Sequence, residues 1–453
     1  MVAGRNDWCI SRQRAWGVPI PCFYDKETKV VLMDEATITH VTEIVRSKGT
    51  DAWWEMELVD LLPDQYKHRA DSLIKGTDTM DVWFDSGSSW AGVVKARGLA
   101  YPANLYLEGS DQHRGWFQSS LLTGVAATGK APYKTILTHG FVLDEKGYKM
   151  SKSLGNVVDP RLIIEGGKNQ KTDPAFGADT LRLWVASTDY TSDVLIGMNI
   201  LKQTSDNYRK LRGTLRFLMG NIGDFDPAAN AVPYEELPAF DRYALYRTAA
   251  MVKEMEVAYE TYAYSTAVST LQSFTTFLSN VYLDVSKDRL YIESPSSAER
   301  RACQTVVAGV VERLLSCIAP VTPHMAEEAW MALPYAKEAG SVFLSGWAPA
   351  PSQWTTGIDE SEIQFWTGVL AIRGEVNKSL EAARNDKLIG ASLQAKAVVY
   401  AADADFAAQL ESRKAELKQA FIVSEVVVVH TQEELMAVCV TTAGLEGEAA
   451  EGV

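Results

Sequence analysis

The stretch GYKMSKSLGN, residues 147–156, places two lysines three positions apart between two glycines. No helical or strand period runs through it, so it predicts a loop. Lys149 and Lys152 carry point charges on flexible stems, which suit phosphate oxygens, and Gly147 and Gly155 would let the loop approach and withdraw. The stretch offers no nucleophile, so its chemistry would be stabilisation of phosphate charge. A solvated surface loop explains the same residues equally well.

A second group of polar residues lies in YLEGSDQHRGWFQSS, residues 106–120. It follows a strand pattern and opens a helical one, where a parallel sheet presents its ligand groups. Carboxylates there suit hydroxyl or ammonium groups, and Trp116 offers an apolar wall. The stretch offers Glu108, Asp111, Gln112, His113, Arg114 and Trp116 within nine residues, with Gly109 and Gly115 as spacers. A helix cap would explain one of these residues but not the cluster, so a binding site is favoured.

Residues 81–90, DVWFDSGSSW, are interpreted as the end of the preceding strand and a glycine turn. Trp83 could line the same site, although a core position suits it as well. By contrast, GVAATGKA (124–131) imitates a phosphate loop but has Ala131 where Ser or Thr would hold magnesium, and helical residues precede it. We reject it as a phosphate site.

Alternating strand and helix patterns over residues 78–143 predict a parallel sheet that positions these groups. Residues 20–70 look like a small mixed insertion, with a helix that ends at Gly49. Beyond residue 160 the pattern is helical. The long helices expected of a bundle are 174–187, 199–220, 239–262, 264–287, 297–318 and 323–332.

The end of the chain predicts a small α/β module. A helix over 360–384 precedes two strands, 395–402 and 425–430, which flank a helix at 404–420. A Pro- and Trp-rich segment, 342–354, is interpreted as a linker. The domains expected are 1–160, 161–200, 201–350 and 351–453.

Bulk composition excludes several classes of protein. The net charge of −14 argues against a surface coated with basic residues for nucleic acid. A local basic face remains, because Arg209, Arg212 and Arg216 fall at i, i+3 and i+7 of one helix. The neighbouring face of that helix has Leu211, Leu215 and Leu218 and can pack into the bundle. None of the five cysteines forms a C-x-x-C pair, so zinc is not expected. No apolar run has membrane-spanning length and the start lacks a secretory core, so we expect a cytoplasmic protein that binds no membrane.

Several separate blocks together resemble one known family. KMSKS (149–153) is similar to the second signature of class I aminoacyl-tRNA synthetases. WCISRQRAWGVPIP (8–21), the two tryptophan-containing stretches above and DTLRLWVAS (179–187) resemble the isoleucyl-tRNA synthetases in particular. The resemblance covers essentially the whole chain and is densest from residue 8 to 190. Valyl enzymes are similar around the lysine loop but differ at the 108–113 turn.

The resemblance implies a Rossmann-like half catalytic domain over residues 1–160, a stem-contact region at 161–200 and an all-α anticodon-binding bundle at 201–350. It implies ATP-dependent formation of isoleucyl-adenylate and transfer to tRNA(Ile), with Mg²⁺. By that analogy Lys149 and Lys152 would act at the phosphates. The ATP-binding set would be Lys149, Ser151, Lys152 and Ser153. Glu108, Gly109, Asp111 and Gln112 would hold the aminoacyl-adenylate, and Trp83 and Trp116 would line the isoleucine pocket. Apart from the resemblance, the spacing of the three arginines in an acidic chain predicts that they contact tRNA, although a solvated face is the commoner fate of a basic stripe. A monomer is expected.

Two departures qualify the resemblance. The family's first signature, His-x-Gly-His, appears nowhere in the sequence, and THGF (138–141) does not replace it. The editing domain is absent as well. We therefore expect a C-terminal portion of a longer synthetase that binds ATP poorly and completes little adenylation alone. The alternative is a stand-alone tRNA-binding protein that retains an inactive half-site.

Overall fold

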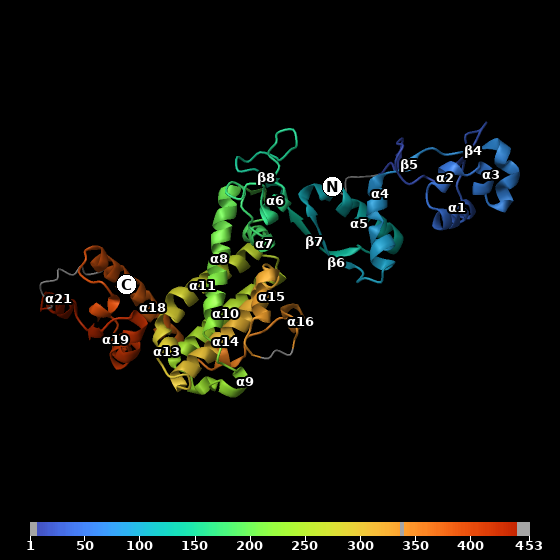
Figure 1. Cartoon of the computed structure of the whole chain (residues 1–453). Coiled ribbons are helices and arrows are strands. Elements are labelled where there is room, and N and C mark those ends of the chain that lie inside the picture. Colours follow the sequence, from blue (N-terminus) through green and yellow to red (C-terminus); the bar gives the residue numbers. More distant parts are fainter. Residues whose placement is uncertain (1–6, 336–338, 442–453) are drawn as a thin grey trace. The chain divides into compact units, whose positions relative to one another are not determined.

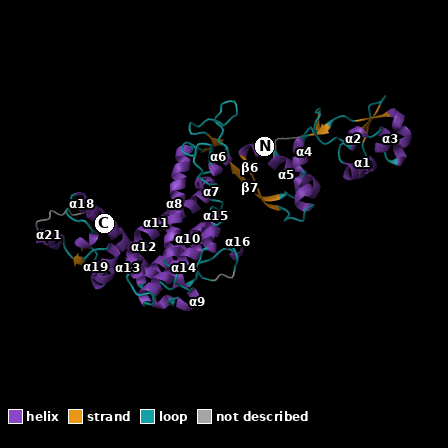
Figure 2. Cartoon of the chain, in the orientation of Figure 1, coloured by secondary structure: helices purple, strands orange, loops and turns teal. Residues whose placement is uncertain are grey.

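The structure, a computed structural model, describes residues 7–335 and 339–441, with two compact units along the chain (Figure 1). The first comprises residues 1–143 and 190–194, and the second comprises 144–189 and 195–453. Strands concentrate in the first unit and long helices dominate the second (Figure 2). This is the order of classes that the sequence patterns predict, and each unit is described by itself.

The predicted insertion is a small α/β lobe of the first unit. Its antiparallel sheet has the order β3-β2-β4 and packs around buried Phe23 and Trp53. The lobe consists of β2 Phe23–Asp25, β3 Val31–Leu32, α1 Glu35–Lys48, α2 Ala52–Glu55, α3 Leu58–Leu61 and β4 Leu73–Lys75. Helix α1 starts with a capping box between Asp34 and Thr37 and ends at Gly49, whose φ of 85° suits glycine. The predicted helix end at Gly49 is confirmed.

The segment around Trp83 is helical, and the predicted strand there is wrong beyond Met80. β1 Ser11–Arg12 pairs with the two-residue β5 Thr79–Met80, and α4 Val82–Gly87 follows directly. Asp81 starts the helix because its carboxylate accepts the Trp83 amide. The other oxygen of this carboxylate, Oδ2, accepts hydrogen bonds from the Arg12 guanidinium at 2.7 Å and from the Trp8 indole N–H at 3.0 Å. Burial of this cap, a tertiary effect, outweighs the strand propensity of the aromatic residues.

A β-α-β unit follows in the first unit, as predicted. β6 Ala103–Gly109 and β7 Tyr133–His139 are parallel and are joined through α5 Trp116–Thr128. Helix α5 ends at Gly129, whose φ of 74° is left-handed. The rejected phosphate-loop imitation is therefore a helix end, as its sequence context indicated. Two short strands, β8 Val142–Leu143 and β9 Val194–Leu195, lie further along the chain.

A helical bundle makes up most of the second unit. Leu211, Leu215 and Leu218 of α8 are buried in its core, as the helical period predicts. Its helices are α6 Pro160–Glu165, α7 Ala178–Ser187, α8 Met198–Gly220, α9 Pro227–Asn230, α10 Ala239–Glu260, α11 Tyr264–Phe277, α12 Leu283–Val285, α13 Lys287–Tyr291, α14 Ala298–Ile318 and α15 Pro323–Met331. The helix expected over 264–287 is interrupted by a π-helical turn at 278–282. That turn keeps both Leu278 and Tyr282 fully buried.

The last part of the second unit is the predicted small α/β module, in which β10 and β11 are parallel. Its elements and those leading to it are α16 Val342–Ser345, α17 Gln353–Thr356, α18 Glu360–Asn385, β10 Lys396–Tyr400, α19 Ala404–Ser412, α20 Lys414–Phe421, β11 Glu425–Val429 and α21 Gln432–Thr441. The single helix expected at 404–420 is broken at Arg413. This residue leaves helical geometry and pairs with Glu362 of α18 at 2.7 Å. Residues 442–453 of the predicted module lie outside the described residues.

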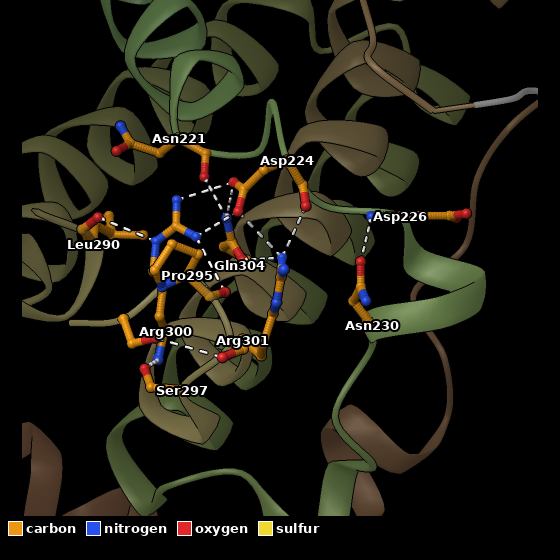
Figure 3. A network of polar contacts seen from close by, with 12 residues as sticks. Asn221, Asp224, Asp226, Asn230, Leu290, Pro295, Ser297, Arg300, Arg301 and Gln304 are labelled. Carbon is orange, nitrogen blue, oxygen red and sulfur yellow. Dashed lines mark hydrogen bonds and ion pairs between the residues drawn. The ribbon is translucent and has the colours of Figure 1, made fainter.

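A polar clamp joins the end of α8 to the start of α14 (Figure 3). Asp224, in the turn after α8, receives the Arg300 guanidinium through two nitrogens at 2.5 and 2.9 Å. Buried Gln304 donates to the same carboxylate at 2.8 Å, and Arg301 donates to the Asp224 carbonyl at 2.9 Å. These contacts orient two bundle helices that are distant in sequence.

Candidate functional site

The polar turn of residues 108–116 lies at the carboxyl end of β6. The register pairs Glu108 with Thr138 and Gly109 with His139, so β6 and β7 end side by side. Glu108 and Asp111 are exposed, and Gln112 is half-buried. The sequence predicted this location, because ligand groups of parallel sheets collect where the strands end.

Gln112 organises the turn. Its side-chain amide donates to Asp111 Oδ2 at 3.1 Å, and its carbonyl oxygen accepts the Trp116 backbone N–H at 3.0 Å. Gly115 is required for this packing, since a Cβ there would lie 2.6 Å from Gln112 Oε1 and 2.9 Å from the Trp83 ring. Trp83 therefore lies directly against the turn, as a wall of the same site would.

Trp116 is a packing residue as well as a candidate wall. Its ring stacks on buried Tyr106, with centroids 4.1 Å apart and planes within 3°. Its indole N–H donates to the Ser86 carbonyl at 3.0 Å and to Ser89 Oγ at 3.2 Å. Burial raises the pKa of Tyr106 beneath it. One face of Trp116 is therefore committed to the fold.

The lysine loop belongs to the second unit. Lys149, Lys152 and Ser153 are exposed, and Ser151 is half-buried. Ser151 Oγ lies 3.1 Å from Ser153 Oγ and accepts the Leu154 amide at 3.2 Å. Both serines thus shape the loop backbone, and Gly147 and Gly155 adopt positive φ of 82° and 67°. The two glycines are needed for the turn geometry itself.

Sequence reasoning passed over two residues that hold this loop, Asp144 and Asn156. Asn156 donates to Asp144 Oδ2 at 2.9 Å and accepts the Ser151 amide at 2.9 Å. The pKa of Asp144 is lowered, first by the Asn156 side chain and then by the Tyr148 amide. Asn156 stood within the quoted stretch, and Asn beside Gly is a common loop signal. Its partner could not be read from local pattern.

A cavity of about 460 Å³ opens beside the roots of the loop. Asp144 and Asn156 line one part of it, and Leu162, Ile163 and Phe176 line another. All its lining residues belong to the second unit. The two ends of the loop, at Asp144 and Asn156, are therefore not packed tightly against apolar side chains on the side of this cavity.

The predicted arginine face on α8 is exposed and partly neutralised. Arg212 forms a two-point pair with Glu328 of α15 at 2.6 and 2.7 Å, and this contact lowers the pKa of Glu328. Arg209 lies 3.3 Å from Asp206 on its own helix. Among the described residues, Arg216 takes part in no ion pair.

The predicted site residues thus form three groups. Glu108, Gly109, Asp111, Gln112 and the two tryptophans gather in the first unit, while the lysine loop and the arginine face belong to the second. Over residues 7–335 and 339–441, no group of three or more His, Cys, Asp or Glu side chains is placed to hold a metal ion. A search of the described helices finds none long and apolar enough to cross a membrane.

Comparison with known families matches both units. Residues 1–197 match the tRNA synthetases class I (I, L, M and V), and residues 241–399 match the anticodon-binding domain of tRNA ligase. The isoleucine–tRNA ligase of Crocosphaera subtropica is 59% identical over 414 residues, which are 91% of this chain and 43% of that protein. The chloroplastic/mitochondrial isoleucine–tRNA ligase of Arabidopsis thaliana is 54% identical over an alignment of 464 positions, which covers 99% of this chain and 42% of that protein.

The chain therefore spans less than half the length of these relatives. Among solved structures, it resembles the ternary complex of Agrobacterium radiobacter K84 agnB2 LeuRS with tRNA and LeuAMS. The TM-score is 0.57 at 18% identity, over 77% of this chain and 42% of that one. At that identity the likeness concerns the fold alone.

Proposed function

The chain belongs to the class I tRNA synthetases, with an anticodon-binding domain after the synthetase domain, and from this premise we propose that it serves isoleucine–tRNA ligation. The reaction would use ATP to activate L-isoleucine as isoleucyl-adenylate and would transfer the acyl group to tRNA(Ile). The observation that carries the proposal is the 59% identity to an isoleucine–tRNA ligase over 91% of the chain.

The turn at the end of β6 would hold the adenylate. Exposed Glu108 and Asp111 offer carboxylates to the substrate's ammonium or hydroxyl groups. Gln112 is already oriented by Asp111 and the start of α5, so little ordering is needed on binding. Gly109 leaves room for the Asp111 carboxylate, since a Cβ there would lie 2.8 Å from Asp111 Oδ1. Trp83 and the free side of Trp116 would contact the branched side chain of isoleucine.

The lysine loop would act on the phosphates. In adenylate formation the substrate carboxylate attacks the α-phosphorus and pyrophosphate leaves, so the protein needs no nucleophile of its own. Its contribution is orientation and stabilisation of charge on the leaving oxygens. Lys152 and Lys149 would supply that charge, and Ser151 and Ser153 would shape the loop around it. Loop closure over the triphosphate and opening afterwards would release pyrophosphate.

Magnesium accompanies ATP in this family, but the described residues do not form a metal site of their own. Magnesium commonly binds through substrate phosphates with few protein ligands. We therefore assign no step to a protein-held metal.

The second unit would hold tRNA. Its helical bundle carries the anticodon-binding match, and α8 presents Arg209, Arg212 and Arg216 on an exposed face. Arginine pairs well with backbone phosphates. Because the sequence contains no His-x-Gly-His, the chain by itself would complete little adenylation while retaining these contacts.

The proposal is tested by titration calorimetry of the chain with non-hydrolysable sulfamoyl analogues of isoleucyl- and valyl-adenylate. We expect the isoleucyl analogue to bind more tightly, because it buries one more methylene in an apolar pocket, worth about 0.8 kcal/mol. Asp111→Asn should weaken both analogues. Equal affinity for the two analogues would reject isoleucine specificity. Binding of tRNA(Ile) without binding of either analogue would favour the stand-alone tRNA-binding alternative.

A further inference from the structure

Asp144 and Asn156 join the two ends of the lysine loop. The Asp144 Oδ1 atom accepts the Lys146 amide at 2.9 Å and the Tyr148 amide at 2.8 Å. Its Oδ2 atom accepts the Asn156 side-chain amide at 2.9 Å. One carboxylate, directly after strand β8, therefore holds both the first turn of the loop and its far end.

Asn156 extends this contact to the backbone between the lysines. Its Oδ1 atom accepts the Ser151 amide at 2.9 Å, and its Nδ2 atom donates to the Lys149 carbonyl at 3.3 Å. Both bonds are to main-chain atoms, so they orient the backbone from which Lys149 and Lys152 project. The lysine ammonium groups themselves take no part in these bonds.

Polar contacts carry more of the loop's order than apolar packing does. Tyr148 is 63% exposed and Leu154 is 68% exposed, so the loop buries little apolar surface of its own. At its roots, the cavity of about 460 Å³ leaves Asp144 and Asn156 without close packing on that side. A hydrogen-bonded pair in this setting has a strong influence on which loop conformation is populated.

Resting on the proposed function, we propose that Asp144 and Asn156 are positioning residues for the phosphate step. The pair, here called the Asp144–Asn156 clasp, sets the loop backbone in the form that presents Lys149 and Lys152 together to a pyrophosphate group. Neither residue touches the phosphates. The clasp acts through the backbone at Lys149 and Ser151.

Trypsin tests the clasp directly, since it cuts after Lys149 and Lys152 only when the loop backbone opens. Cleavage of a transiently opened segment follows the population of the open form. We expect Asn156→Ala to speed both cuts about tenfold, the effect of losing roughly one charge-assisted hydrogen bond. Asp173→Ala is the matched control, because Asp173 is another carboxylate on the same cavity and contacts Thr172, not the loop. If trypsin cleaves Asn156→Ala after Lys149 and Lys152 no faster than it cleaves this control, the proposal is overturned.

A swapped pair separates a specific contact from general loop damage. In Asn156→Asp alone, two carboxylates face each other and the loop should open. In the double variant Asp144→Asn with Asn156→Asp, the amide donates in the opposite direction and the oxygens that accept Lys146, Tyr148 and Ser151 remain. Only the longer bond to the Lys149 carbonyl, at 3.3 Å, is lost. The double variant should recover part of the protection that the single variant loses, because one of the two main-chain bonds of residue 156 remains. Additive damage in the double variant would contradict a clasp.

Pyrophosphate affinity, measured by calorimetry on the whole chain, tests the positioning role. Asn156→Ala should weaken pyrophosphate binding about tenfold, Asp173→Ala should not, and the swapped pair should restore part of it. Faster trypsin cuts with unchanged pyrophosphate affinity would show a purely structural clasp and would overturn the proposal. Lys149→Ala with Lys152→Ala is a separate check: unchanged binding there would reject the lysines' phosphate role, while the trypsin result would still report on the clasp.

Discussion

Lys152 is the residue on which the proposed chemistry depends most. In an enzyme that contains this chain and completes adenylation, Lys152→Ala should slow isoleucine-dependent ATP–pyrophosphate exchange. The activation free energy should rise by ~3 kcal/mol, the typical effect of losing one charge-stabilising contact. Binding of tRNA should be nearly unchanged, because the arginine face is on another element. Exchange at the rate of the unmodified enzyme would refute the assignment.

Trp116 combines two roles that substitutions can separate. Trp116→Ala removes both the stack on Tyr106 and the indole hydrogen bonds, so we expect a loss of about 2–4 kcal/mol in the free energy of unfolding. Trp116→Phe keeps an aromatic face on Tyr106 and should lose about 1 kcal/mol. Urea denaturation would measure both values.

Affinity for the isoleucyl-adenylate analogue then decides the pocket role of Trp116. We expect Trp116→Phe to bind the analogue almost as well as the unmodified chain, since an aromatic wall remains. A large loss of affinity in the folded Phe variant would mean that the indole itself contacts the ligand. Unchanged affinity in a folded Ala variant would make Trp116 purely structural.

Among the elements, α8 provides the basic face on which tRNA binding is proposed to depend. Replacing Arg209, Arg212 and Arg216 by Ala should weaken tRNA binding and flatten its salt dependence by up to about three counterions. Filter binding across a salt series measures the slope. A slope equal to that of the unmodified chain would mean that the three arginines are solvated and do not contact tRNA.

The pair between Arg212 and Glu328 suggests a variant with the opposite effect. Glu328→Gln removes the carboxylate that now occupies Arg212 and leaves the helix otherwise unchanged. Because an exposed pair contributes only about 0–1 kcal/mol, stability should barely change. Binding of tRNA should tighten and its salt slope should steepen. Asp206→Asn, which frees Arg209 in the same way, is the matched comparison.

The clamp between α8 and α14 predicts a pH effect. The Arg300 guanidinium, followed by Gln304, lowers the pKa of Asp224 from 3.8 to about 2. A carboxylate whose pKa is lower in the folded than in the unfolded chain stabilises the fold at every pH above the unfolded pKa. This contribution is lost as the pH falls from about 4 towards 2. Asp224→Asn should therefore unfold at lower urea concentration at pH 5, and its difference from the unmodified chain should shrink near pH 2. A constant difference over that range would exclude the titration of Asp224 as the cause.

For the whole molecule, the residues of the proposed function are distributed over both units. The first contains the turn that is proposed to hold the adenylate. The second contains the lysine loop, which is proposed to act on the phosphates, and the anticodon-binding match. The lysine loop follows β8 directly, so only a few residues separate its lysines from the first unit along the sequence. The proposed domain limits at residues 160, 200 and 350 stay predictions. They differ in kind from the division at residues 143 and 144, which follows spatial contacts.

Local pattern was sufficient for much of this protein. The helical period placed Leu211, Leu215 and Leu218 in the core, the β-α-β alternation predicted parallel β6 and β7, and the glycine after α1 marked its end. These features depend on residues a few positions apart, whose spacing is written in the chain. The motif blocks and their order along the chain likewise indicated the family. The roles of the individual site residues remain proposals.

Tertiary structure decided the features that join distant residues. The helix at Trp83 depends on Asp81, which Arg12 and Trp8 hold from across the sheet edge. Arg413 interrupts a helix where it pairs with Glu362, 51 residues earlier in the sequence. Asn156 reaches Asp144 only when the loop folds back, and the Glu328 carboxylate on another helix offsets part of the charge that Arg212 presents. Propensity is summed over neighbours in sequence, whereas burial and pairing are set by neighbours in space, so no local pattern could have shown these contacts.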